Sequence, residues 1–227
     1  MAQQQAREEA EVLGELQDIR LGQSERLSLA VNSAINRYHA GELLARFCGE
    51  HPYARLQVDE LPSRQVIQAV IAGSVELGMG PFQTHMSAVE CIPLFDEIRT
   101  LVVSPAHPLA DALIEDPETY LAQVPLLASW LDDPAERPGG ERIRDYFSRV
   151  WQVRPINLRL ELLARGHAVG YVSDLVLAQE PLCDGLLEIA SMPFSRIHRS
   201  VGLFHRRDVS PSAGARNFIE LCRENWL

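Results

Sequence analysis

The chain is constrained most by a regular alternation of strand-length apolar runs with helix patterns, which starts at residues 27–37, LSLAVNSAINR. Residues 27–31 form an apolar run of strand length, and Asn32 and Ser33 after it are residue types that cap helix N-termini. We expect the helix to continue to about residue 47 or 48. Helix N-termini at the carboxyl edge of a sheet are where open α/β folds bind small ligands, so this junction is a candidate site.

The same alternation continues through the chain. A strand at 55–61, a helix from Ser63 to Gly73 and a strand at 75–80 complete a parallel unit with right-handed crossovers. Pro81 and Phe82 are expected to end that strand, and strands follow at 91–95 and 98–103. A second set of elements comes next: strands at 124–128, 153–158, 168–172, 186–189 and 200–206, and helices at 137–150, 160–165, 174–179 and 212–225.

These patterns predict an α/β fold of two Rossmann-like lobes, joined by crossover strands near 93–103 and 198–206, with a ligand cleft between them. We assign residues 23–98 and 205–227 to lobe I and residues 99–204 to lobe II. Residues 1–22 are a separate linker segment. Within it, residues 2–20 carry a narrow apolar stripe, which predicts a helix that packs on another chain or on the body of the protein; the alternative is a frayed end.

Composition excludes several kinds of chemistry. The net charge of −10 argues against a nucleic-acid surface on this chain, because such surfaces need clustered positive charge. All 21 basic residues are arginine, so Schiff-base lysines and phosphate-loop lysines are excluded. The sequence shows no secretory signal and no apolar stretch of transmembrane length, so we expect a cytoplasmic protein without membrane contact.

The cysteines and histidines do not form a recognisable site. The four cysteines are widely spaced and are interpreted as reduced core thiols. Cys48 with His51 gives only two of the four ligands of a structural zinc, and His198 and His205 are expected on opposite faces of a strand. There is no GxSxG or HExxH motif for an enzyme, so we expect no catalytic residue, no metal and no cofactor; a thiol sensor is the weaker alternative.

Several polar and aromatic residues fall at predicted strand ends and could line the cleft. Asn32, Ser33 and Ser63 offer donors for an anionic group, although a serine there could also do no more than cap its helix. Each of the others could equally be core or surface, but together they suit a mostly apolar small-molecule site. The remaining candidates are Pro81, Phe82, Thr100, Ser129, Trp130, Gly170 and Tyr171.

Seven segments in order resemble the effector-binding half of LysR-type transcriptional regulators. They are a polar helix before GQSERLSLAV, then LLARFCGEHPYARLQV, AVIAGSVELGMG, PLFDEIRTLVVSPAHPLA, ARGHAVGYVSD, DGLLEI and SAGARNFIELCRE, with AGSVELGMG and VVSPAHPLA the most telling. The resemblance implies a fold like that of type 2 periplasmic binding proteins and a small-molecule effector at the junction of Asn32 and Ser33.

The resemblance also implies self-association, as an antiparallel dimer or a tetramer, and DNA binding only through an N-terminal winged helix-turn-helix. Nothing in the 227 residues corresponds to that DNA-binding domain, so we expect an excised or truncated regulatory domain. Residues 153–165 are shorter than the family pattern, so no pocket residues are transferred there. The alternative function is a free-standing solute-binding protein of the same bilobal fold, which would carry a secretory signal.

Overall fold

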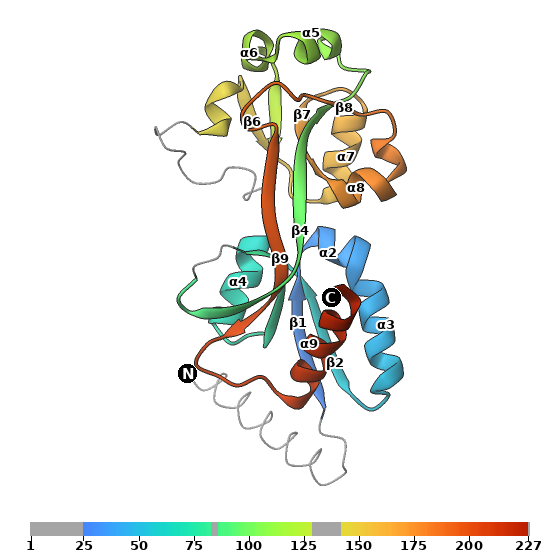
Figure 1. The fold of residues 1–227 in the computed structure, drawn as a ribbon, viewed down its shortest axis with the longest axis vertical. Coiled ribbons are helices and arrows are strands. Elements are labelled where there is room, and N and C mark those ends of the chain that lie inside the picture. Colours follow the sequence, from blue (N-terminus) through green and yellow to red (C-terminus); the bar gives the residue numbers. More distant parts are fainter. Residues whose placement is uncertain (1–24, 83–85, 129–141, 227) are drawn as a thin grey trace, which may run out of the picture.

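The computed structural model describes residues 25–82, 86–128 and 142–226, which form two α/β lobes stacked along the long axis of the molecule (Figure 1). Two long strands run through both lobes: β4 (Val89–Val103) and β9 (Arg196–Arg206). The expected bilobal fold with crossover strands is therefore confirmed.

Lobe I contains the N-terminal elements and the C-terminal helix. They are β1 (Arg26–Val31), α2 (Ser33–Ile35), a π-helical turn η1 (Asn36–Ala40), α3 (Gly41–Glu50), β2 (Arg55–Glu60), α4 (Ser63–Ile71), β3 (Leu77–Phe82) and α9 (Ala213–Trp226). Lobe II contains α5 (Ala110–Glu115), α6 (Pro117–Tyr120), η2 (Leu121–Gln123), β5 (Pro125–Ala128), η4 (Ile143–Tyr146), β6 (Arg149–Gln152), α7 (Ile156–Ala164), β7 (Val169–Ser173), α8 (Asp174–Gln179), η5 (Pro181–Cys183) and β8 (Leu187–Glu188).

The described strands form one continuous nine-stranded sheet in the order β2-β1-β3-β9-β4-β7-β5-β6, with β8 on β4. In lobe I, β1 pairs in parallel with β2 and β3; in lobe II, β5 pairs in parallel with β6 and β7. Between them β9 runs antiparallel to both β3 and β4. The predicted parallel units are thus present, one in each lobe.

The crossing strands are a longer feature than the sequence indicated. Two strands were expected at 91–95 and 98–103, but β4 is a single strand of 15 residues. It pairs with β9 from Val89 opposite Arg206 to Thr100 opposite Arg196, with one register shift between Pro93 and Phe95. Near this shift Gly202 lies so close to β4 that a Cβ atom there would be 2.0 Å from the carbonyl oxygen of Ile92.

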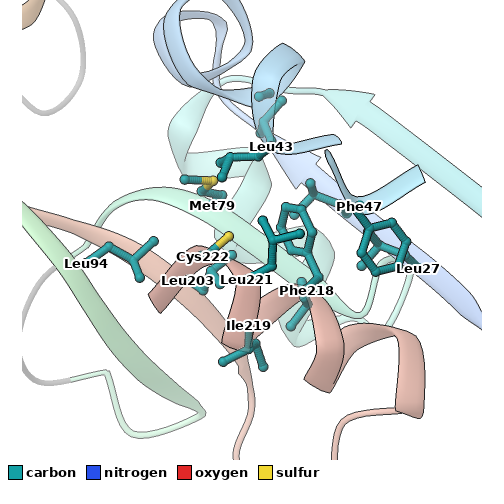
Figure 2. Close-up of a cluster of buried hydrophobic side chains, with 14 of the residues drawn as sticks. Leu27, Leu43, Phe47, Met79, Leu94, Leu203, Phe218, Ile219, Leu221 and Cys222 are labelled. Atoms are coloured by element: carbon teal, nitrogen blue, oxygen red, sulfur yellow. The ribbon is translucent and has the colours of Figure 1, made fainter. Parts of the chain in front are cut away.

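Each lobe has its own hydrophobic core. In lobe I, α3 and α9 pack on the sheet, and Leu27, Phe47 and Phe218 are fully buried among Met79, Leu203 and Cys222 (Figure 2). In lobe II the core gathers around Leu101 and Phe194. Because Val201 and Leu203 belong to the first cluster and Ile197 to the second, β9 contributes to both cores. The lobe boundaries drawn from sequence at 98/99 and 204/205 stay a prediction.

Three local predictions were wrong. Pro81 and Phe82 continue β3, which is possible because β1 pairs with β3 only as far as Met79. Residues 153–158 were expected as a strand and 160–165 as a helix, but helix α7 already begins at Ile156, with Ile156, Leu160 and Leu163 on its buried side. The expected helix at 137–150 is not found over its described part, where η4 and β6 lie instead.

The cysteines are all free, but only two match the expected burial. Cys183 and Cys222 are buried, whereas Cys91 is half-buried and Cys48 is exposed on α3. The interpretation of all four as core thiols was therefore wrong for Cys48, which lies on the outward side of its amphipathic helix. The predicted helix at 2–20 lies outside the described residues. In the part of the chain that is described, each helix is too short or too polar to cross a membrane.

Candidate functional site

A cleft of about 740 Å³ lies between the lobes. Lobe I contributes the β1–α2 junction and the first turn of α4; lobe II contributes β5, β7, α7 and the segment after β6. Glu97, Arg99 and Arg199 of the crossing strands also line it. The volume is within the usual range of small-molecule sites.

The lobe I wall is organised by Asn32, which is buried at the end of β1. Its Oδ1 accepts a hydrogen bond from the backbone N–H of Ile35 at 2.9 Å, so Asn32 is the N-cap of the first helix. Its Nδ2 donates to the hydroxyl of Ser63 at 3.1 Å, across two strand-to-helix junctions. Two residues predicted as separate candidates therefore touch.

Ser33 and Ser63 are not helix caps, so the alternative that each serine only caps its helix is wrong. Ser33 is the first helical residue after the Asn32 cap. Ser63 is likewise the first residue of α4, whose N-cap is Pro62 and has no side-chain capping hydrogen bond. Both serines are half-buried on the cleft wall. Neither hydroxyl is required as the cap of its helix.

The structure brings five of the predicted residues to the cleft: Asn32, Ser33, Ser63, Gly170 and Tyr171. Pro81 lies behind this wall, beside Asn32 in a second, very small cavity of about 20 Å³. Phe82 packs against the lobe I core and Thr100 is buried between β7 and β9, so neither is brought to the wall. Ser129 and Trp130 lie outside the described residues.

Tyr171 forms part of the lobe II wall but its hydroxyl is already engaged. It donates to the carbonyl oxygen of Phe194 at 2.7 Å inside the core of lobe II. The guanidinium of Arg99 donates to the backbone carbonyl of Tyr171. Tyr171 is therefore held in place from both ends, and Gly170 before it leaves room for Leu127, whose Cβ would lie 3.3 Å from a Cβ at that position.

An ion pair on the crossing strands was not anticipated from sequence. Arg199 of β9 donates to Glu97 of β4 through Nε at 3.1 Å and Nη2 at 2.6 Å. The two side chains are only 13% and 11% exposed. Because a buried charge is costly unless it is paired, each side chain of the pair compensates the charge of the other where the two strands line the cleft.

The cleft lining is rich in arginine although the chain as a whole is acidic. Among the described residues that line it, six are arginines and two are glutamates. The glutamates are Glu60 and Glu97, and the arginines are Arg64, Arg99, Arg144, Arg154, Arg159 and Arg199. A concentration of guanidinium groups in a chain of net charge −10 favours an anionic ligand.

A second contact joins the lobes beside the cleft. Arg37 and Tyr38 of η1 in lobe I both donate to the same oxygen of Glu180 in lobe II, at 2.7 Å and 2.9 Å. Burial by itself would raise the pKa of Glu180, but the hydrogen bonds from Tyr38 and Arg37 outweigh it and lower that pKa. Burial, supported by the hydrogen bond to Glu180, raises the pKa of Tyr38 to about 12, so its phenol stays protonated. We call these three residues the Glu180 clasp.

The described residues contain no group of three or more histidine, cysteine or acidic side chains that could hold a metal ion. His198 is exposed and His205 is buried, on the two sides of β9. His39, packed between Phe95 and Trp226, has its pKa lowered by burial.

Comparisons with known proteins agree with this architecture. Residues 20–227 match the sequence model of the LysR substrate binding domain. The chain is 23% identical over 205 residues to the uncharacterized HTH-type transcriptional regulator YeiE of Escherichia coli K12, covering 86% of this chain and 67% of that protein.

Two solved regulatory domains show the same fold. One is the CcmR regulatory domain of Synechocystis PCC6803 in complex with 2-PG, with a TM-score of 0.67 and 17% identity over 89% of this chain and 97% of that one. The other is the effector binding domain of QuiR in complex with shikimate, with a TM-score of 0.66 and 14% identity over 88% and 96% of the two chains.

Proposed function

Because this chain belongs to the LysR substrate-binding domain family, we propose that it is a ligand-sensing domain that binds a small anionic effector in the cleft between its lobes. The observation that carries the proposal is the convergence of Asn32, Ser33 and Ser63 with arginines on a cleft of about 740 Å³. Backbone N–H groups at the starts of α2 and α4 add donors to this wall.

The sensing step follows from the position of the site. A ligand that contacts both lobes stabilises the lobe orientation to which it binds more tightly, by no more than its difference in affinity for the two orientations. In a full-length regulator that shift would be passed to DNA-binding domains. We propose that this chain reaches DNA only in that way, since its own net charge is −10.

The remaining features of the proposal concern assembly and setting. We propose a homodimer or homotetramer, no catalytic activity and a cytoplasmic location. The sequence carries neither a GxSxG nor an HExxH motif, and the edge strand β2 presents a row of backbone groups that a second copy could cover. Light scattering that returned the mass of one 25.4 kDa chain at high micromolar concentration would refute self-association.

The proposal is tested by a thermal-shift screen of small metabolites, since a ligand specific for the folded state raises the melting temperature. Each hit is then titrated by calorimetry against Ser33→Leu and Ser63→Leu, which place bulk on the cleft wall. We expect both variants to stay folded and to lose binding. The matched control is Ser210→Leu, at an exposed serine outside the cleft lining. Unchanged affinity in both cleft variants would place the site elsewhere.

A further inference from the structure

The side-chain amide of Asn32 is held in one orientation by its two partners. Asn32 is 8% exposed, and its Oδ1 accepts the backbone N–H of Ile35 at 2.9 Å. The opposite orientation of the amide would place its NH2 group against that N–H, donor against donor. The Nδ2 atom therefore faces Ser63, to whose Oγ it donates at 3.1 Å. The direction of this hydrogen bond is thus set by the backbone of the first helix.

This direction determines how the hydroxyl of Ser63 is used. A serine hydroxyl has one hydrogen to donate and two lone pairs that accept. Because one lone pair receives the amide of Asn32, the hydroxyl hydrogen must point away from Asn32. Ser63 is also the first residue of α4, so no earlier turn of that helix offers it a carbonyl oxygen. In the part of the chain that the structure describes, this hydrogen meets no acceptor, and Ser63 lines the cleft.

Ser33, on the same wall, shows the contrast. It is the first helical residue after the Asn32 cap and also lines the cleft. No side chain among the described residues donates to its hydroxyl, which can therefore turn to donate or to accept. Of these two serines, Ser63 is the one whose hydrogen-bonding direction is fixed by a neighbour.

We propose that Asn32 is a positioning residue, which by donating to Ser63 presents the Ser63 hydroxyl to the effector as a donor. The lobe I wall then selects a group that accepts hydrogen bonds at this point, such as a carboxylate. It discriminates against a carboxamide, which has the same shape but carries an NH2 group in place of one oxygen, because a donor that faces a donor is left unpaired. This inference rests on the proposed function, since it concerns the same cleft.

The test compares carboxylates with carboxamides of the same shape by calorimetric titration of the whole chain. The probes are hexanoate, octanoate and phenylacetate, paired with hexanamide, octanamide and phenylacetamide. Their apolar bodies suit Leu127, Ile156 and Leu160, which line the cleft from lobe II. We expect at least one acid to bind about tenfold more tightly than its amide, the effect of one polar contact left unpaired.

The variant Asn32→Asp reverses the hydrogen bond between the two side chains. One carboxylate oxygen still accepts the N–H of Ile35, since aspartate is also a good N-cap. The other oxygen can only accept, so the Ser63 hydroxyl must donate to it and turn its lone pairs toward the cleft. We expect the affinity for the carboxamides to rise about tenfold, a gain that a general loss of structure would not produce. In a Ser63→Ala background the same substitution should give no gain.

The matched control is Asn157→Asp, which makes the same charge change at an exposed residue of α7 outside the cleft lining. We expect its ratio of acid to amide affinity to equal that of the unmodified chain. Melting of the unliganded variants checks their folds. If Asn32→Asp does not fold, Asn32→Ser replaces it. Serine also caps a helix, but its shorter side chain would release the Ser63 hydroxyl, so the carboxamides should gain about threefold in affinity.

Five results would overturn the inference: no acid binds, acids and amides bind equally to the unmodified chain, the carboxamides gain nothing in the Asn32 variant that folds, the gain persists in the Ser63→Ala background, or Asn157→Asp gives the same gain. These outcomes are distinct from failure of the proposed function, which the Ser33→Leu and Ser63→Leu titrations decide. An acid from the metabolite screen that loses binding there, but whose amide binds the unmodified chain equally well, would keep the cleft as the effector site and reject the role of Asn32.

Discussion

Replacing Glu180 by alanine should destabilise the domain because the Glu180 clasp connects the two lobes through one buried carboxylate. Glu180 is 7% exposed and receives both the guanidinium of Arg37 and the hydroxyl of Tyr38. The Arg37 side chain is 46% exposed, so solvent screening reduces its contribution to about 0.5–1 kcal/mol. The hydrogen bond from the half-buried Tyr38 to a charged acceptor contributes about 1.5–2 kcal/mol. We therefore expect Glu180→Ala to lower the free energy of unfolding by about 2–3 kcal/mol.

Urea denaturation at neutral pH measures this loss, and two comparisons isolate its cause. The matched control is Glu161→Ala, which removes a carboxylate from the exposed pair with Arg165 and should cost no more than about 0.5 kcal/mol. A double-mutant cycle of Tyr38→Phe with Glu180→Ala should give a coupling free energy of about 1–1.5 kcal/mol. If Glu180→Ala costs no more than Glu161→Ala, the clasp does not stabilise the lobe arrangement.

The clasp should also be visible in the pH dependence of stability. The pKa of Glu180 is lower in the folded chain than the ordinary value of 4.5, which an unfolded chain approaches. Its contribution is therefore fully present above that ordinary pKa and is lost as the pH falls through the folded pKa. Glu180→Gln should remove this part of the acid sensitivity, so the difference in unfolding free energy between the two proteins should shrink as the pH is lowered through that range.

Three further predictions use other parts of the molecule. Gly202→Ala should destabilise the domain by about 2–3 kcal/mol in urea denaturation, because the carbonyl of Ile92 would have to move away from the new methyl group; a loss under about 0.5 kcal/mol would contradict the close approach of β4 and β9. Cys48 should react with a thiol reagent in the native state, whereas Cys222, buried and with its pKa raised to about 12 by that burial, should react only on unfolding; equal native rates would refute this. Finally, the isolated chain should give no gel shift with duplex DNA at physiological salt, because its net charge is negative. Binding with micromolar affinity would show that this net charge does not prevent DNA binding.

The sequence was informative where local pattern decides local structure. Asn32 and Ser63 could be predicted because a strand-length apolar run followed by capping residues marks a strand-to-helix junction, and parallel strands bring such junctions to one edge. Their mutual hydrogen bond also depends on the pairing of β1 with β2, in which Val31 lies opposite Glu60.

The residues that sequence reasoning missed depend on contacts between distant segments. Glu97 and Arg199 are 102 residues apart and meet only because β4 and β9 pair. The place of Arg159 on the cleft wall was not predicted, because residues 153–158 were expected to form a strand and not the start of a helix. The β-branched and apolar residues there fit a short strand as well as a helix. Thr100 shows the converse error: its place near a strand end was predicted, but the cleft is lined by its neighbour Arg99.

The antiparallel pair β4–β9 has a mechanical consequence. Its ladder extends from Val89 to Thr100 without leaving the sheet, so no flexible single-chain hinge separates the lobes along it. If one lobe rotates relative to the other, the paired strands β4 and β9 must twist together. The backbone hydrogen bonds between them oppose that twist. Both strands also supply side chains to both cores. Unfolding of either strand in one lobe would therefore remove core side chains from the other lobe as well. Effector-driven motion should therefore be a small, elastic rotation, and the two lobes should melt as one cooperative unit.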